Sequence, residues 1–302
     1  MNPLFNSRIS FVLVGLSLSC LSIALVGASG PYVPAMYVFG DSLADAGTNN
    51  FIPHCTARAN FTPYGVSYFP YPTGRFTNGR TTFDFLATSF LGLPYFLPPF
   101  LEPNSNFSVG VNFASGGSGL LDSTGATLNI IPMSTQVQQF ENFMMKKQTH
   151  KYIGSENPKS SLVESLYCIS IGGNDIFNYL LNSTFQNTTT PEQFVTSLLT
   201  NFNSYITRLY HVGARKFLVS DIAALGCTPI VRLFLGNGEC LDFANQLAMQ
   251  YNTGLKSLVD QLNQQMDGMS LILLNSYDFL IDMIQHGEDY GKAYSLLFSF
   301  LY

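Results

Sequence analysis

The 302-residue chain is 46% hydrophobic and only 11% charged, with a formal net charge of −5 at pH 7. This length suits one large α/β domain or two small ones, and the apolar content is ample for a sizeable core. The chain has no run of basic residues, which excludes nucleic acid as an expected partner.

The first 30 residues have the pattern of a secretory signal. Arg8 precedes a long apolar run, and the segment GASG at 27–30 supplies the small residues that a signal peptidase requires. The alternative is an uncleaved anchor, because the run approaches the roughly 20 residues that span a bilayer. We predict a signal peptide over residues 1–28, with its boundary at 28–30. A single domain over 31–302, with no membrane span once the signal is removed, should follow.

Five short apolar runs in the rest of the chain predict strands, near residues 35–39, 110–114, 166–171, 216–220 and 270–274. Such runs, without strict alternation, suit parallel strands covered on both faces. Amphipathic segments at 134–148, 190–213 and 241–266 predict helices between them; in the second, Thr190 is a candidate cap and Gly213 a candidate stop. This alternation predicts a doubly wound parallel sheet with right-handed crossovers. The strand order 2-1-3-4-5 is predicted from three signatures at strand ends, described next.

Three of these strands end in short polar or glycine-rich signatures. They are Gly-Asp-Ser at 40–42, Ser-Gly-Gly-Ser-Gly at 115–119 and Gly-Gly-Asn-Asp at 172–175. In open parallel sheets, ligands bind where the carboxyl ends of the strands meet the following loops. We therefore expect the three signatures to open onto one edge of the sheet.

Each signature has a structural and a functional interpretation. Ser42 either caps a helix or is a nucleophile, which would need a general base. The glycine-rich loop is either a flexible turn or a cradle of N–H groups for an anion, and its spacing is not that of a dinucleotide site. Asn174 either fills a turn or directs its amide at a developing oxyanion.

Sequons and cysteines favour an extracellular protein. Four Asn-x-Ser/Thr acceptors are present, at Asn60, Asn106, Asn182 and Asn187. Cys227 and Cys240 bracket a turn-rich segment and are predicted to form a loop disulfide. Cys168 lies in an apolar run and is expected to be a buried thiol, whereas Cys55 has no assigned partner.

Five segments occur in an order that resembles the plant GDSL esterase/lipase family of the SGNH hydrolase superfamily: FGDSLADAGTNN, PYGVSYFPYPTGRFTNGRTTFDFLA, GVNFASGGSGLL, SIGGNDIFNYL and GARKFLVSDIAALGCTPI. The resemblance implies a flavodoxin-like three-layer α/β/α sandwich with a five-stranded parallel sheet. It also implies hydrolysis of carboxylic esters by a serine nucleophile. Together with the signal and the sequons, we expect a secreted protein of the apoplast or cell wall that acts on lipid, cell-wall or small acyl esters without a cofactor or metal. Carried over by position, Ser42 is the nucleophile, Gly116 a backbone oxyanion donor and Asn174 a side-chain donor; Gly117 replaces Gly116 if the register slips by one.

One further signature of the family, a C-terminal Asp-x-x-His that supplies the base, does not occur in this sequence. None of the four histidines has an aspartate three residues before it. The resemblance therefore implies a truncated or alternatively spliced product, or an incomplete gene model, without the last helix. Two substitute bases stay open: His54, in the loop after the first strand, and His286, four residues after Asp282 in what is otherwise a solvated helix pair.

Two classes of function consequently stay open. The first is a secreted ester hydrolase whose base comes from an unexpected place. The second is a catalytically incomplete family member with a binding role or no activity. The chain as written is expected to show at most trace esterase activity, because no evident imidazole is available to Ser42.

Overall fold

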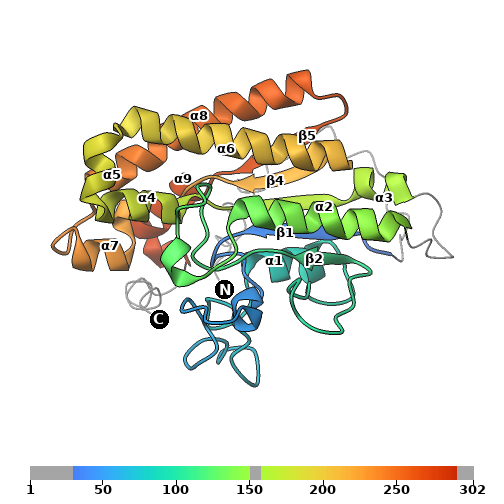
Figure 1. Ribbon diagram of the computed structural model, residues 1–302. Helices are drawn as coiled ribbons and strands as arrows, with labels where there is room; N and C mark the ends of the chain where they lie inside the picture. Colours follow the sequence, from blue (N-terminus) through green and yellow to red (C-terminus); the bar gives the residue numbers. More distant parts are fainter. Residues whose placement is uncertain (1–29, 150–157, 291–302) are drawn as a thin grey trace, which may run out of the picture. The chain divides into compact units, whose positions relative to one another are not determined.

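The computed structural model describes residues 30–149 and 158–290 (Figure 1). The predicted signal peptide and residues 291–302 lie outside these residues. The chain divides into two units, Met1–Pro31 and Tyr32–Tyr302, and the account below concerns the second. Within the part that the structure describes, no helix is both long and apolar enough to cross a membrane.

The second unit is built on a five-stranded parallel sheet in the order β2-β1-β3-β4-β5. Its strands are β1 (Met36–Gly40), β2 (Gly110–Asn112), β3 (Leu166–Ser170), β4 (Lys216–Ser220) and β5 (Ser270–Leu274). All five predicted strands and their order are confirmed. Gly40 lies opposite Ser170, and Ser170 lies opposite Ser220, so β1, β3 and β4 end level at one edge of the sheet.

Helices cover both faces of this sheet (Figure 1). The long helices α2 (Met133–Thr149), α6 (Pro191–Val212) and α8 (Asp242–Gln265) lie on one side, where sequence periodicity predicts three helices. Thr190 caps α6 as predicted: its side chain accepts from the Gln193 N–H, and the Gln193 side chain accepts from the Thr190 N–H. The other described helices are α1 (Thr82–Phe85), α3 (Pro158–Glu164), α4 (Gly173–Leu181), α5 (Ser183–Thr188), α7 (Pro229–Phe234) and α9 (Ser276–Gln285).

Alternation along β1 divides the core into two parts. Tyr37 and Phe39 point toward α2, where their rings lie 5.1 and 5.7 Å from the ring of Phe140. Met36 and Val38 point to the opposite side and pack in a second cluster with Phe83 of α1. The two clusters on opposite faces of one sheet establish the predicted three-layer α/β/α arrangement.

On the α1 side, the face of the sheet is buried at β1 and β3 but not at β5. Val38, Cys168, Leu218 and Ile272 form one register row across β1, β3, β4 and β5 and so share a face. Val38 and Cys168 are fully buried, whereas Ile272 is 52% exposed. Among the described residues, this side of β5 therefore presents apolar surface to solvent.

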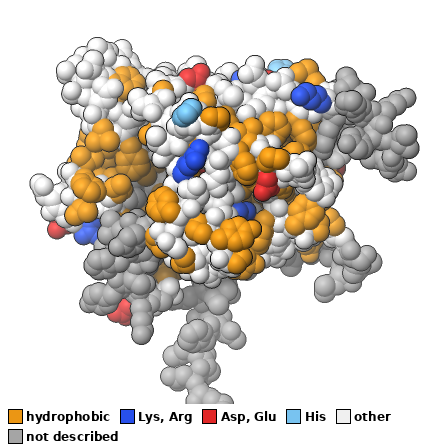
Figure 2. All heavy atoms as spheres, turned by 60° about the horizontal axis from the view of Figure 1, so that its bottom comes forward, with side chains coloured by type: hydrophobic (Ala, Val, Ile, Leu, Met, Phe, Trp, Pro, Cys, Tyr) orange, Lys and Arg blue, Asp and Glu red, His pale blue; other side chains and the backbone are white. Residues whose placement is uncertain are grey.

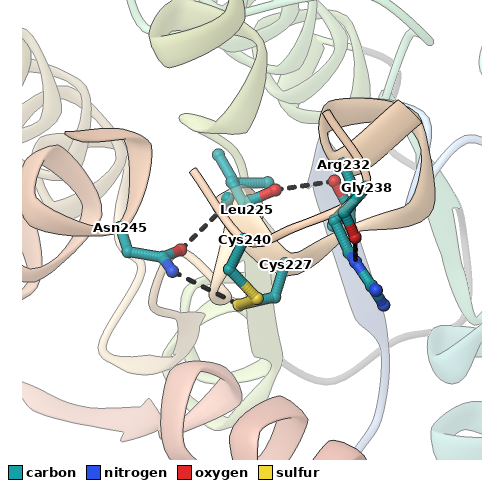
Figure 3. The surroundings of a disulfide bond; sticks show 8 residues. Leu225, Cys227, Arg232, Gly238, Cys240 and Asn245 are labelled. Carbon is teal, nitrogen blue, oxygen red and sulfur yellow. Dashed lines mark hydrogen bonds between the residues drawn. A yellow bond between two sulfur atoms is a disulfide. The ribbon is translucent and has the colours of Figure 1, made fainter. Parts of the chain in front are cut away.

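The predicted disulfide is present and closes the loop that carries α7 (Figure 3). Cys227 and Cys240 are bonded with their Cα atoms 4.3 Å apart. Asn245 fixes the start of the loop by donating to Cys227 Sγ at 3.3 Å and accepting from the Gly226 N–H at 2.8 Å. Cys168 is a buried free thiol, as predicted, and burial raises its pKa; Cys55 is also free and buried.

Candidate active site

Ser42 lies in a tight turn immediately after β1, not at the cap of a helix. The next helical segment begins at Thr48, and its N-cap is Gly47. The turn is closed by Asp41, whose carbonyl accepts from the Asp45 N–H at 2.9 Å and whose carboxylate accepts from the Leu43 N–H at 3.0 Å. The helix-cap interpretation of Ser42 is therefore wrong. The serine is half-buried, and Leu43 beside it is 65% exposed.

Glycine is required at the position where β1 meets this turn. Gly40 has φ +145°, and a Cβ there would lie 2.1 Å from the carbonyl oxygen of Ser170 on β3. The close approach lets the Asp41 N–H donate to that same oxygen at 3.1 Å. The turn that carries Ser42 is thus held directly against the end of β3.

Asp45 ties the Ser42 turn to the glycine-rich loop. This carboxylate is fully buried and accepts from the N–H groups of Gly47 at 2.7 Å, Thr48 at 2.6 Å and Gly116 at 2.9 Å. An N–H that already donates to a carboxylate is not free to stabilise an oxyanion, which conflicts with the role expected for Gly116. The Gly117 N–H, by contrast, makes no hydrogen bond within the described residues.

Asn174 lies in the first turn of α4, so it does not merely fill a loop. Its side chain is half-buried, and Nδ2 donates to the carbonyl of Ser118 at 3.0 Å. Ser118 Oγ in turn donates to the carbonyl of Gly40 at 3.0 Å, two residues before Ser42. A continuous set of hydrogen bonds therefore joins the three signatures at one edge of the sheet.

Two further residues that hold this edge together were not predicted from the sequence. Gln136 of α2 accepts from the Gly40 N–H at 2.9 Å and donates to the Gly40 carbonyl at 2.9 Å. Asp175, fully buried, accepts from the N–H groups of Leu120 at 2.8 Å and Leu121 at 3.0 Å. Gln136 carries no local signal because its partner is 96 residues away, whereas Asp175 directly follows the predicted Asn174.

Three buried carboxyl groups surround the Ser42 turn. Burial raises the pKa of Asp41 to about 7, and the nearby charges of Asp175 and Asp45 add to the shift. Burial also raises the pKa of Asp45 and of Asp175 to about 6, although backbone N–H donors oppose the shift in both. The folded protein therefore holds these protons more tightly than an unfolded chain, in which each group titrates near 3.8.

Stability is expected to fall as pH rises through this range. Because the folded-state pKa values exceed the unfolded value, the contribution of the three groups is fully present below about pH 4 and is lost as pH rises to about 7. The midpoint of thermal unfolding should thus be higher at pH 5 than at pH 7.5. Asp41→Asn, which keeps the acceptor oxygen for Leu43, should reduce that difference. A midpoint that rises with pH would contradict the assignment.

Neither substitute base is hydrogen-bonded to Ser42 in the part of the chain that the structure describes. His54 is exposed, adopts φ +56° and makes no hydrogen bond there. His286 is paired as expected: Nδ1 lies 2.8 Å from Asp282 Oδ1, and the two side chains are 58% and 49% exposed. Tyr290 donates its hydroxyl proton to the other oxygen of Asp282. Asp282 can therefore orient the imidazole of His286, whereas no carboxylate contacts His54 among the described residues. The high exposure of His286 and Asp282 is nevertheless typical of a solvated ion pair on a helix.

Comparison with known proteins identifies the family of the chain. Residues 36–292 match the family model described as GDSL-like Lipase/Acylhydrolase. Three relatives from Arabidopsis thaliana are similar over most of this chain. GDSL esterase/lipase At2g23540 is 36% identical over 96% of this chain and 78% of its own length. GDSL esterase/lipase At3g50400 is 39% identical over 85% of this chain and 72% of its own length, and GDSL esterase/lipase 6 is 39% identical over 84% of this chain and 70% of its own length. A solved structure from Veillonella parvula, titled as a member of the lipolytic protein G-D-S-L family, aligns at 12% identity over 87% of this chain and 93% of that chain, with a TM-score of 0.40. On the family match and the three relatives, the chain belongs to the GDSL-like lipase/acylhydrolase family and is, by that kinship, a carboxylic ester hydrolase.

Proposed function

We propose that this chain hydrolyses carboxylic esters with Ser42 as the nucleophile. The observation that carries the proposal is the hydrogen-bonded linkage of the Ser42 turn, the glycine loop and the start of α4 through the Gly40 carbonyl and Ser118. This linkage holds the Ser42 turn next to the glycine loop and the start of α4, at the sheet edge where parallel α/β folds bind ligands, and so supports the proposal.

The donors follow from which N–H groups are free. The backbone N–H groups of Ser42 and Gly117 make no hydrogen bond within the described residues, whereas that of Gly116 is bound by Asp45. We assign the oxyanion donors as the Ser42 N–H, the Gly117 N–H and the second N–H of Asn174 Nδ2, since an amide nitrogen carries two and Ser118 takes one. This assignment replaces Gly116 with its neighbour, the alternative register expected from the sequence.

In the reaction, Ser42 Oγ bonds to the acyl carbon while its proton passes to a base. The carbonyl oxygen becomes an oxyanion held by the three donors, the ester oxygen leaves as the alcohol, and water then hydrolyses the acyl-enzyme. The base is the component that the described residues do not bring to Ser42.

Replacement of Asn174 tests the donor assignment. Measured in a protein extended with a family-type Asp-x-x-His segment, Asn174→Ala should lower kcat for p-nitrophenyl butyrate by about 10²–10³-fold with little change in KM, because the donor acts on charge that develops in the transition state. The exposed Asn78, which lies outside this hydrogen-bonded set, provides the control in Asn78→Ala. Equal kcat values for Asn174→Ala and Asn78→Ala would overturn the role of Asn174.

We also propose that the protein is secreted and glycosylated. The four sequon asparagines are all exposed, as an oligosaccharide requires. The Cys227–Cys240 disulfide suits an oxidising compartment such as the apoplast or cell wall. Expression in a plant or insect secretory system should give protein in the medium whose mass falls on glycosidase treatment. Unmodified protein retained in the cytosol would refute the proposal.

A second candidate function is ligand binding without catalysis. It is favoured by one observation: among the described residues, Ser42 Oγ has no histidine partner. In that case the site would bind an ester or a carboxylate with normal affinity and turn nothing over. Turnover that depends on Ser42 excludes this alternative.

A further inference from the structure

A row of aromatic rings leads from the glycine loop to the molecular surface. Phe76 begins the row: a Cβ added to Gly116 would lie 2.3 Å from Phe76 Cε2, so the ring rests on the backbone of that loop. The ring of Tyr64 lies 5.9 Å from that of Phe76, and the ring of Phe61 lies 5.2 Å from that of Tyr64. Phe76 and Tyr64 are half-buried, and Phe61 is 56% exposed.

Backbone contacts hold the row in place. The Gly65 N–H donates to the Thr77 carbonyl at 2.9 Å, and the Ser67 N–H donates to the Asn78 carbonyl at 2.7 Å. These bonds set the segment that carries Tyr64 beside the segment that carries Phe76. The glycine loop is tied to the same part of the chain, the lobe formed by residues 46–101, because Asn49 Nδ2 donates to the Gly116 carbonyl at 2.8 Å. The row is therefore a fixed extension of the candidate site.

The lobe that carries the row is poor in negative charge. Residues 46–101 contain three arginines and one acidic residue, Asp84, against eleven basic and eighteen acidic residues in the rest of the chain. Asp84 is buried and paired with Arg75, so this lobe exposes no carboxylate. Hydrophobic side chains gather on the face shown in Figure 2, the underside of the view in Figure 1. Such a surface suits an apolar ligand better than a charged or sugar-like one.

We propose that Phe76, Tyr64 and Phe61 bind the apolar chain of the ester and give the site a preference for long over short acyl groups. The inference rests on the proposed function, because it assumes that the carbonyl lies against the Ser42 and Gly117 N–H groups. Each methylene that leaves water for the rings should tighten binding by roughly threefold to fourfold. Three or four such methylenes in contact then favour a ten-carbon over a four-carbon chain by about 50-fold or more.

Binding of non-hydrolysable products separates this inference from catalysis. The protein used is Ser42→Ala, and the probes are decanoate and butyrate, measured by calorimetry. Decanoate should bind at least about 50-fold more tightly than butyrate. Adding Phe61→Ala should weaken decanoate by about tenfold and leave butyrate unchanged, because Phe61 contacts only the far part of the chain. Phe76→Leu, which keeps a side chain of similar bulk against Gly116, should weaken decanoate as well.

The matched control is Phe90→Ala. Phe90 belongs to the same lobe and is 69% exposed, but it has no ring contact with the row among the described residues. Equal affinities for decanoate and butyrate, or an equal effect of Phe90→Ala and Phe61→Ala, would overturn the inference. So would a self-associated protein that Phe61→Ala converts to monomer without any change in decanoate binding. If the protein turns over no ester but its decanoate binding still depends on Phe61 and Phe76, the inference about binding is supported. Only the proposal of hydrolysis is then refuted.

Discussion

Extending the chain beyond Tyr302 with a family-type Asp-x-x-His segment is expected to raise p-nitrophenyl butyrate turnover by about 10⁴–10⁶-fold. The N–H groups of Ser42 and Gly117 make no hydrogen bond within the described residues, and no imidazole is hydrogen-bonded to Ser42 there. A serine hydroxyl without a base is a poor nucleophile, and the oxyanion donors alone sustain only residual catalysis. The measurement compares kcat for the two proteins under identical conditions.

Ser42→Ala in the extended protein is the control, and it should return the rate to that of the 302-residue chain. Equal and Ser42-dependent rates in both proteins would contradict the prediction and show that a base is already present. His54→Ala and His286→Ala would then identify it. His286 is the better oriented of the two, because Asp282 Oδ1 lies 2.8 Å from its Nδ1.

Arg75→Ala is expected to lower the free energy of unfolding by about 3–5 kcal/mol. Arg75 and Asp84 are 7% and 4% exposed, and two parallel bonds join them, Nε to Oδ2 at 2.7 Å and Nη2 to Oδ1 at 2.9 Å. Arg75 Nη1 also donates to the Ala46 carbonyl at 3.1 Å, next to the Asp45 that holds the Ser42 turn. Its loss leaves a buried carboxylate without its cation. Urea denaturation measures the change.

Arg80→Ala is the matched control for this prediction. Arg80 lies five residues away and is half-buried, and its guanidinium lies over the rings of Tyr68 and Phe85 rather than against a carboxylate. Its removal should cost about 1 kcal/mol. Replacing both partners, in Arg75→Met with Asp84→Leu, should recover part of the loss because no unpaired charge remains. An Arg75→Ala protein within about 1 kcal/mol of the parent would contradict the assigned role.

Local pattern was sufficient to predict the framework of the protein. The five strands, the helices α2, α6 and α8 and the capping of α6 all follow from apolar periodicity and terminal residues that lie within a few positions of one another. The strand order pairs residues far apart in sequence, such as Met36 and Leu166, and was predicted from the three strand-end signatures through the rule for parallel sheets. The Cys227–Cys240 pairing likewise follows from a short loop. Apart from the strand order, each of these features depends on interactions between near neighbours in sequence, so the sequence displays them directly.

The roles of individual groups at the site were decided only by tertiary contacts. Gly116 and Gly117 are indistinguishable as neighbours in a glycine-rich loop. The structure separates them because Asp45, 71 residues away, takes the N–H of Gly116 and not that of Gly117. Gln136 reaches Gly40 across 96 residues, and Ile272 is exposed although it shares a register row with buried Val38 and Cys168. A hydrogen-bond donor can be used once and a sheet face is covered only where another element lies on it, and both conditions are set by segments that meet solely in the folded chain.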